Sequence, residues 1–145
     1  MKMYKPTLLC LDDEETNLNA LERLFKEKYD VLKALNAEKA FAILDDRPDI
    51  AVILSDQRMP IITGVEFFEK SLLTHPDTSR ILLTGYAEID SIINAVNKAR
   101  IFRYMTKPWN AIDLINTVEQ ACEKYILKTK LKKNKIKKLR VKPCQ

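Results

Sequence analysis

The chain contains 145 residues, of which 46% are hydrophobic and 31% are charged, and its formal net charge at pH 7 is +5. This length and composition are typical of one soluble globular domain with a single core. No apolar run approaches the ~20 residues that a membrane-spanning helix needs, and the first residues do not resemble a secretory signal peptide. We therefore expect a cytoplasmic protein without a membrane segment.

Two kinds of apolar pattern alternate along the chain. Short continuous runs predict buried strands, and runs with apolar residues every three or four positions predict amphipathic helices. In the first half we expect strands at 7–11, 29–35 and from 50, with helices around Leu18–Phe25 and at 37–44, the second capped by Asn36. In the second half we expect strands at 80–84 and 101–105, with helices carrying Val65 and Phe68, Ile89 to Val96, and a last one from about Asn110.

This alternation predicts the fold class. Five strand–helix units with short connections and right-handed crossovers give an α/β fold, in which helices cover both faces of a parallel sheet. The run Ile50–Leu54 is too short for a buried helix and suits the central strand of such a sheet. The pattern alone does not prove the order of the strands.

The basic charge is concentrated at the C-terminal end. From Cys122 onward, ten lysine or arginine residues stand against Glu123 alone, so this segment carries about +9 and the preceding part about −4. We expect residues 128–145 to form a basic helical linker or a disordered tail. A linker to an output domain, a patch for nucleic acid or an acidic partner, and a frayed chain end all remain open. No known DNA-binding motif supports the second of these.

The cysteines and the histidine carry little of the chemistry. Cys10, Cys122 and Cys144 are odd in number and form no CxxC pair, which favours reduced thiols and argues against a metal bound through sulfur. His75, the only histidine, precedes a proline at a predicted helix end, where we expect a structural role.

Polar side chains follow four of the predicted strands. Because the carboxyl ends of parallel strands meet at one edge of a sheet, we expect Asp12, Asp13, Asp56, Thr84 and Lys107 to converge. Carboxylates that close repel one another unless a cation joins them, and Mg²⁺ is a hard cation that prefers oxygen ligands. Taken singly, the first two aspartates could cap a helix and the lysine could be a solvated surface residue.

The motifs at these positions resemble the receiver domain of two-component response regulators. They are Asp12-Asp13, Asp56 before Met59-Pro60 and Gly64, the segment 83–87 (Leu-Thr-Gly-Tyr-Ala), and the segment 104–109 (Tyr-Met-Thr-Lys-Pro-Trp). The resemblance covers roughly residues 5–127 and implies a receiver domain at 1–127 with the sheet order 2-1-3-4-5. The sequences of these motifs are similar to those of receivers joined to HD-type cyclic-dinucleotide phosphodiesterases or to transcription activators.

The resemblance also implies a role for each residue at the strand ends. Asp56 would accept a phosphoryl group from a phosphohistidine on a histidine kinase or phosphotransfer protein. Asp12, Asp13 and Asp56, with the main-chain carbonyl of Arg58, would hold Mg²⁺ or Mn²⁺. Lys107 would contact the phosphoryl group and Thr84 would hydrogen-bond it.

Further residues would transmit and tune the signal. In the family, the aromatic residue at Tyr104 moves when the threonine moves, and this alters the surface of the fourth helix, fifth strand and fifth helix, which could dimerise or bind a partner. Arg58 and Tyr86 occupy positions that modulate hydrolysis of the aspartyl phosphate, although both could be inert surface residues. Tyr104 could likewise be an ordinary half-buried strand residue, and we expect Trp109 to pack at the start of the last helix.

Other function classes fit the sequence less well. A flavodoxin needs a hydroxyl-rich phosphate loop after the first strand, but here the turn is Asp-Asp-Glu-Glu and would repel an anion. A phosphatase with an aspartyl nucleophile usually has a second aspartate two residues on, where this chain has Arg58. The open alternatives concern scope: a complete regulator that acts by docking, the receiver part of a longer regulator with a phosphodiesterase or DNA-binding output domain, or a regulator that binds nucleic acid through its basic tail.

Overall fold

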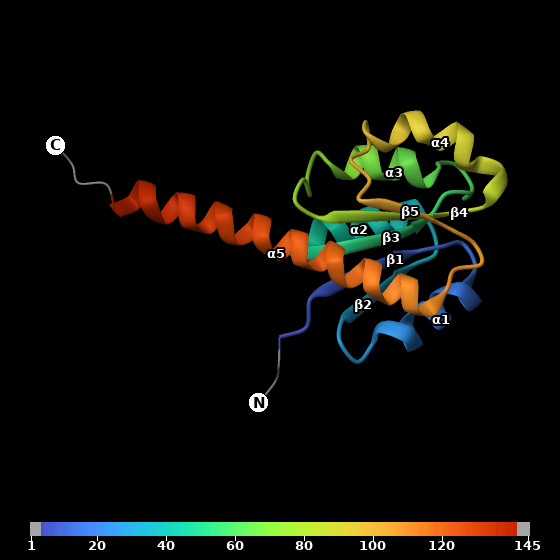
Figure 1. Ribbon diagram of the computed structural model, residues 1–145, viewed down its shortest axis with the longest axis horizontal. Helices are drawn as coiled ribbons and strands as arrows, with labels where there is room; N and C mark the ends of the chain where they lie inside the picture. The colour runs from blue at the N-terminus through green and yellow to red at the C-terminus, as the bar shows by residue number, and fades with distance from the viewer. Residues whose placement is uncertain (1–3, 142–145) are drawn as a thin grey trace.

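The computed structural model describes residues 4–141, and for Tyr86, Arg140 and Val141 it describes the main chain only. Strands and helices alternate through this part of the chain (Figure 1). The strands are β1 (Thr7–Leu11), β2 (Asp30–Ala34), β3 (Ile50–Asp56), β4 (Ser79–Thr84) and β5 (Arg103–Thr106). The helices are α1 (Glu15–Phe25), α2 (Ala37–Asp46), α3 (Gly64–Ser71), α4 (Ile89–Val96) and α5 (Ala111–Val141), and a 3₁₀ turn, η1 (Tyr86–Glu88), precedes α4.

The five strands form one parallel sheet in the order β2-β1-β3-β4-β5, which confirms the predicted fold class and strand order. All seven residues of β3 are buried. This central position explains its continuous apolar sequence, because a strand covered on both faces has no side that meets water.

Two strands begin later than predicted, and both differences have the same physical cause. The main-chain N–H of Tyr29 donates to Phe25 O and completes the end of α1, so β2 begins at Asp30. The N–H of Ile101 donates to Val96 O at the end of α4, so Ile101 lies outside β5, whose pairing with β4 begins at Arg103. In each case a helix end uses the donor that the apolar pattern assigned to the strand.

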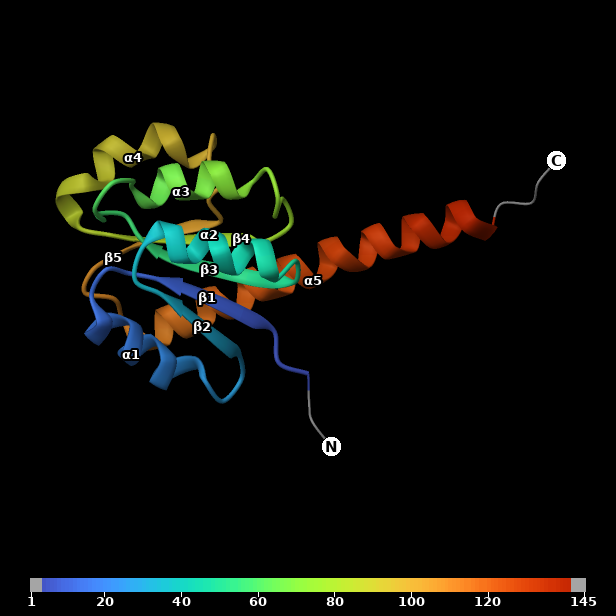
Figure 2. The same ribbon diagram turned by 180° about the vertical axis from the view of Figure 1, so that it is seen from behind.

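The helices cover the two faces of the sheet in two groups (Figures 1 and 2). Side chains of α1 and α5, such as Leu18 and Val118, share one apolar cluster with β1, β3 and β4. Side chains of α2, α3 and α4, such as Leu44, Phe68 and Ile92, share the other. The domain is therefore a three-layer α/β/α structure with the sheet in the middle.

Side-chain hydrogen bonds cap the starts of α2 and α3. Asn36 accepts a hydrogen bond at 2.8 Å from the N–H of Lys39 at the start of α2, as the sequence predicts. At the start of α3, Thr63 and Glu66 form a reciprocal capping box, with distances of 3.2 and 3.1 Å. Gly64 follows this cap and lies close to the end of β3.

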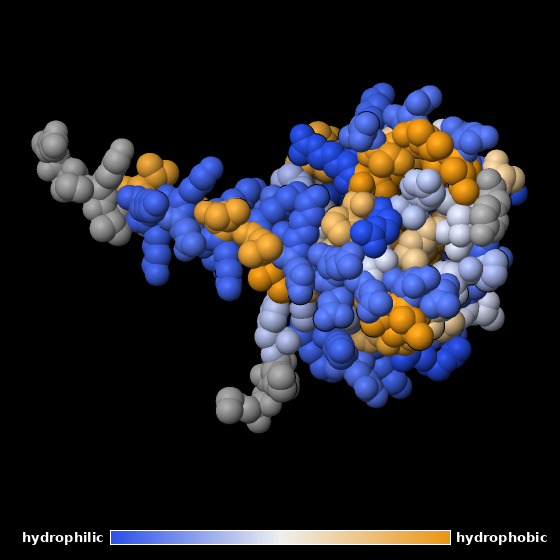
Figure 3. Space-filling view, in the orientation of Figure 1, coloured by the Kyte–Doolittle hydropathy of each residue, from blue (hydrophilic) through white to orange (hydrophobic). Residues whose placement is uncertain are grey.

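Helix α5 has 31 residues and continues well past the domain (Figure 1). Its first part packs on the sheet through Leu114, Val118 and Ala121, which are fully buried. Farther along, Leu127 and Leu131 are 61% and 63% exposed, and Figure 3 shows the projecting part as mainly hydrophilic with isolated apolar side chains. Among the described residues, no helix is both long enough and apolar enough to cross a membrane.

Candidate functional site

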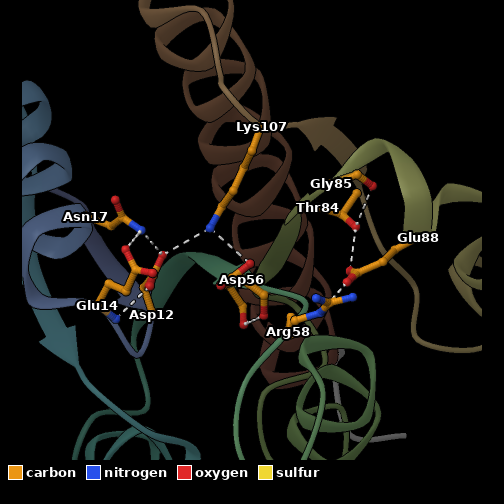
Figure 4. Close-up of polar contacts among 10 residues, drawn as sticks. Asp12, Glu14, Asn17, Asp56, Arg58, Thr84, Gly85, Glu88 and Lys107 are labelled. Carbon is orange, nitrogen blue, oxygen red and sulfur yellow. Dashed lines mark hydrogen bonds and ion pairs between the residues drawn. The ribbon is translucent and has the colours of Figure 1, made fainter.

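The candidate site lies at the edge of the sheet where the parallel strands end (Figure 4). Asp56 is the last residue of β3, Thr84 is the last residue of β4, and Asp12 directly follows β1. Lys107 directly follows β5, and its main-chain N–H donates to Thr84 O at 2.8 Å. The parallel topology therefore brings together side chains that are up to 95 residues apart in the sequence.

Three carboxylates form the acidic part of this edge. Asp12, Asp13 and Asp56 each offer an oxygen atom, and these three atoms all lie within 4.8 Å of one another. Asp12 is buried, Asp13 is exposed, and the side chain of Asp56 is 12% exposed. One carboxylate is thus open to solvent while the other two lie deeper in the edge.

The two aspartates after β1 do not act as the helix caps considered from the sequence. The N-cap position of α1 is Glu14, whose side chain makes no capping hydrogen bond. Asp12 instead accepts hydrogen bonds from the N–H of Glu14 at 2.9 Å and from Asn17 Nδ2 at 3.2 Å. These contacts fix the orientation of the Asp12 carboxylate toward the site.

Lys107 is the cation of the site rather than a solvated surface residue. Its Nζ lies 3.1 Å from Asp56 Oδ1 and 3.4 Å from Asp12 Oδ2, so one ammonium group bridges the ends of β3 and β1. Burial lowers the pKa of Lys107, but its hydrogen bond to Asp56 and the charges of Asp56 and Asp12 outweigh this, so the pKa is raised overall. Lys107 therefore carries its charge at neutral pH.

Opposing effects act on the pKa of the Asp56 carboxyl. Burial raises its pKa most strongly, and the neighbouring Asp12 and Asp13 charges raise it further, whereas Lys107 lowers it. The result is a pKa above the ordinary value for aspartate. Lys107 alone thus offsets only part of the cost of placing this carboxylate beside two others.

The donor set at this edge fits a hard divalent cation. It consists of carboxylate oxygens, with no sulfur or imidazole donor in the cluster, and oxygen is the ligand that Mg²⁺ and Mn²⁺ accept most readily. The exposed position of Asp13 leaves one side open to solvent, which suits a cation that retains several waters. The residues present could hold a metal ion.

Thr84 is at the same edge, but its hydroxyl faces another partner. Its Oγ1 donates to Glu88 Oε2 at 3.2 Å, with Gly85 O at 3.4 Å as a second acceptor. The other oxygen of the Glu88 carboxylate, Oε1, lies 2.8 Å from Arg58 Nε, in an ion pair where the side chain of Arg58 is 83% exposed (Figure 4). The hydroxyl is therefore held on the side of Glu88.

The chain that follows Asp56 is fixed by a set of close contacts. The N–H of Gly64 donates to Gln57 O, and the N–H of Val65 donates to Gln57 Oε1, both at 3.0 Å. A Cβ atom at Gly64 would lie only 2.5 Å from Asp56 O. Glycine is therefore required here for close approach of α3 to the end of β3, which positions Asp56.

The remaining residues singled out in the sequence lie next to the site or away from it. Tyr104 is 37% exposed on β5, opposite Leu82 of β4, and it lines a cavity of about 540 Å³ between β5 and α5 that also includes Trp109 and Asp113. Trp109 is half-buried and packs against the apolar cluster, as expected. The side chain of Tyr86 lies outside what the structure describes.

The histidine and the cysteines stay outside the site. His75 is buried, with Nδ1 2.8 Å from Thr74 Oγ1 and Nε2 2.8 Å from Arg47 O, so it joins two loops and has a structural role. Cys10 and Cys122 are buried free thiols, and Cys144 lies outside the described residues.

Two residues at the site were not singled out from the sequence. Asn17, in the first turns of α1, holds Asp12, and Glu88 joins Thr84 to Arg58. Their spacing gives only weak signals, because an asparagine five residues after an aspartate and a glutamate four residues after a threonine are common. Their roles follow from the tertiary arrangement.

Comparison with known proteins agrees with this geometry. A family model described as the response regulator receiver domain matches residues 8–119. The hydrogenase transcriptional regulatory protein HoxA of Cupriavidus necator is 44% identical over 123 residues, which cover 85% of this chain and 25% of that protein. The chain thus spans about a quarter of the length of the curated relatives it matches.

Solved structures show the same fold. A signal receiver domain of an HD domain-containing protein from Pseudomonas fluorescens Pf-5 has a TM-score of 0.82 and 28% identity, covering 90% of this chain and 96% of that one. An adenylate cyclase from Rhodopirellula baltica has a TM-score of 0.86 and 28% identity, covering 93% and 99% of the two chains. From the sheet order, the acidic edge and the match over residues 8–119, the chain belongs to the family of response regulator receiver domains.

Proposed function

We propose that Asp56 accepts a phosphoryl group from a phosphohistidine on a histidine kinase or phosphotransfer protein, and that this modification switches a protein-interaction surface. The observation that carries the proposal is the position of the Asp56 carboxylate, 3.1 Å from Lys107 Nζ and within 4.8 Å of two further carboxylates at the end of the sheet. This arrangement combines a nucleophile, a cation and a set of metal ligands in one place.

The chemistry needs little beyond charge and position. An ionised carboxylate attacks phosphorus without a general base, so Asp56 forms the new O–P bond while the P–N bond of the donor breaks. The electron pair of that bond stays on the donor imidazole. Lys107 is placed to neutralise charge on the phosphoryl oxygens, which is the main requirement of phosphoryl transfer.

Asp12, Asp13 and Asp56, with the main-chain carbonyl of Arg58, are the residues we assign to Mg²⁺ or Mn²⁺. When bound, the cation supplies positive charge beside the transferring oxygens and offsets the repulsion among the carboxylates. Asn17 and the N–H of Glu14 hold the Asp12 carboxylate in place for this role.

The output surface of the proposed switch is formed by α4, β5 and α5. Phosphorylation adds a group of about −2 charges that attracts the Thr84 hydroxyl, and Tyr104 on the neighbouring strand then moves into the space that Thr84 leaves. The partly exposed position of Tyr104 beside the 540 Å³ cavity supports such a movement, because the side chain borders open space. Ile93 of α4 is 51% exposed and gives this surface an apolar contact for a partner or a second copy.

A second proposal concerns scope: the chain is the receiver part of a longer regulator with an output domain. It is favoured by the curated relatives, of which the matched segment makes up only about a quarter and several of which are named as transcriptional regulators. The continuation of α5 through the basic residues to Val141 suits a helical connection to such a domain. The mass of the native gene product decides between this proposal and a single-domain regulator that acts by docking.

Intact-mass spectrometry after incubation with a small phosphodonor tests the main proposal. We expect one phosphoryl adduct on the wild-type protein with Mg²⁺, much less after chelation of the metal, and none on Asp56→Asn. Asp90→Asn removes an exposed aspartate from the first turn of α4 and serves as the matched control, which should be modified like the wild type. A full adduct on Asp56→Asn would refute the assignment.

A further inference from the structure

The carboxylate of Glu88 contacts two of the groups that surround the proposed phosphoryl site. Oε2 accepts a hydrogen bond from Thr84 at 3.2 Å, and Oε1 pairs with Arg58 Nε at 2.8 Å (Figure 4). The side chain of Glu88 is only 19% exposed, whereas that of Arg58 is 83% exposed, so the carboxylate is partly shielded from water on the side of Thr84. The Glu88 carboxylate therefore links Arg58, two positions after Asp56, to Thr84, the last residue of β4.

The side chain of Glu88 does not cap α4, the helix that follows it. It occupies the N-cap position of α4, but its side chain makes no capping hydrogen bond, and its carboxylate is turned toward Arg58 and Thr84 instead. The acidic residue in the first turn of α4 is Asp90, which is exposed. A favourable interaction with the helix dipole thus does not explain where the Glu88 carboxylate points.

A phosphoryl group on Asp56 and the Glu88 carboxylate would compete for the same donors. Thr84 has a single hydroxyl proton, so it cannot satisfy both acceptors at full strength. A phosphoryl group carries more negative charge than a carboxylate and has three acceptor oxygens, which makes it the stronger acceptor. Arg58, close to Asp56 in the sequence, is attracted by the new charge in the same way.

We propose that Glu88 is a positioning residue that stands in for the phosphoryl group in the unmodified protein, holding Thr84 and Arg58 until the modification displaces it. This inference rests on the proposed function of Asp56 and adds that Glu88 opposes the change that phosphorylation causes. Glu88 ends η1 and directly precedes α4, and its main-chain carbonyl accepts the Ser91 hydroxyl at 2.7 Å. Release of its carboxylate is therefore transmitted straight to the first turn of α4, on the output surface.

The first test compares phosphorylation rates of Glu88→Gln and the wild type with a small phosphodonor and saturating Mg²⁺, followed by intact mass. Glutamine keeps the size of the side chain but loses its charge, so the ion pair with Arg58 is lost. We expect the rate to rise about twofold to fivefold, the effect of a partly exposed ion pair. Asp90→Asn, which removes a charge from the same segment, should leave the rate unchanged.

A double-mutant cycle separates this role from simple repulsion of an anionic donor. In an Arg58→Gln background Glu88 has lost one of its two partners, so it holds Thr84 less firmly and Glu88→Gln should accelerate phosphorylation less than in the wild type. If Glu88 acted only by repelling the donor, the unpaired carboxylate would repel more strongly and the effect of Glu88→Gln would grow. A larger effect in that background would overturn the proposal.

A readout without phosphorylation completes the test. In NMR spectra of the unmodified protein, Glu88→Gln should shift the Thr84 amide and methyl signals toward their positions in the phosphorylated wild type, and Asp90→Asn should not. If the wild type is phosphorylated but Glu88→Gln changes neither the rate nor these signals, the inference fails and the proposed function stands. If the wild type acquires no phosphoryl group, both fail.

Discussion

The pKa of Asp56 shows that the charges of the site are only partly balanced. Burial and two neighbouring carboxylates raise the pKa of Asp56 even though an ammonium group lies 3.1 Å away. The clustered carboxylates, which would hold the metal, therefore oppose stability in the metal-free protein, and Lys107 offsets only part of this effect. Shifted pKa values of this kind are typical of functional sites, where neighbouring charges are arranged for chemistry rather than for stability.

The first prediction at this scale is that Asp56→Asn stabilises the metal-free protein at neutral pH. A raised pKa in the folded state means that the folded protein binds the proton more tightly than the unfolded chain, so the free energy of unfolding falls as pH rises from the ordinary aspartate range through the raised pKa. Asparagine has no proton to lose and avoids this loss. Urea unfolding between pH 3 and 7 with a chelator measures the difference.

The stability gap between Asp56→Asn and the wild type should widen as pH rises and then level off. Mg²⁺ should reverse the order, because a ligand that binds only the folded wild type adds about 1.4 kcal/mol at ten times its Kd. A gap that does not change with pH, or a variant less stable than the wild type in the chelator at pH 7, would contradict the electrostatic account.

The second prediction concerns the close approach of α3 to the end of β3. In Gly64→Ala the new Cβ would lie 2.5 Å from Asp56 O and 2.7 Å from Leu82 Cδ1, and the first of these atoms belongs to the main chain of a buried strand and cannot move aside. We expect a loss of about 1–3 kcal/mol in the free energy of unfolding, and slower phosphorylation because Asp56 shifts. Thermal and urea unfolding measure the first effect.

Gly85→Ala is the matched control for this prediction. A Cβ at Gly85 meets no atom within 4 Å, so its effect on stability should stay within about 0.5 kcal/mol. Equal stability of the two variants would show that the space at Gly64 does not matter.

At the scale of elements, α5 has two parts with different surroundings. Up to Ala121 and Cys122 its inner face is buried against the sheet, whereas from Lys130 to Leu139 every described side chain is exposed. Contact with the domain in this projecting part includes the ion pair of Lys132 with Asp77, at 2.7 Å. The core of the domain therefore does not depend on the projecting part.

We predict that a chain ending at Leu127 folds and is phosphorylated like the longer one. Exposed ion pairs contribute about 0–1 kcal/mol, so the free energy of unfolding should fall by no more than about 1 kcal/mol. Lys132→Gln, which removes only the ion pair, is the comparison that isolates this contact. A loss of more than 3 kcal/mol on truncation would mean that the basic segment packs on the domain.

At the scale of the whole molecule, α5 links the two ends of the structure. It begins four residues after Lys107, near the acidic edge, passes along one face of the sheet and projects from the opposite end (Figure 1). A shift at the carboxyl ends of the strands can therefore reach the basic segment through one continuous helix. Electrostatically, the molecule combines an acidic functional edge with a basic projection.

The sequence predicted the sheet and the convergence of Asp12, Asp56 and Lys107 because these depend on simple rules: buried parallel strands are continuously apolar, and their ends share an edge. It could not predict where β5 begins, since the N–H of Ile101 is used by the end of α4. Nor could it find Glu88, whose partners are set by how η1 packs beside the loop after β3. The sequence alone does not decide whether the basic segment is helical, because closely spaced like charges oppose a helix.

We predict that Asp56, and no other carboxylate of the acidic edge, carries the phosphoryl group. Borohydride reduces an aspartyl phosphate to homoserine, so treatment after phosphorylation followed by peptide sequencing in the mass spectrometer locates the modified residue directly. We expect homoserine at position 56, dependent on Mg²⁺, with unmodified aspartate at positions 12 and 13. Homoserine at Asp12 or Asp13, or a phosphorylated protein with intact aspartate at position 56, would contradict it.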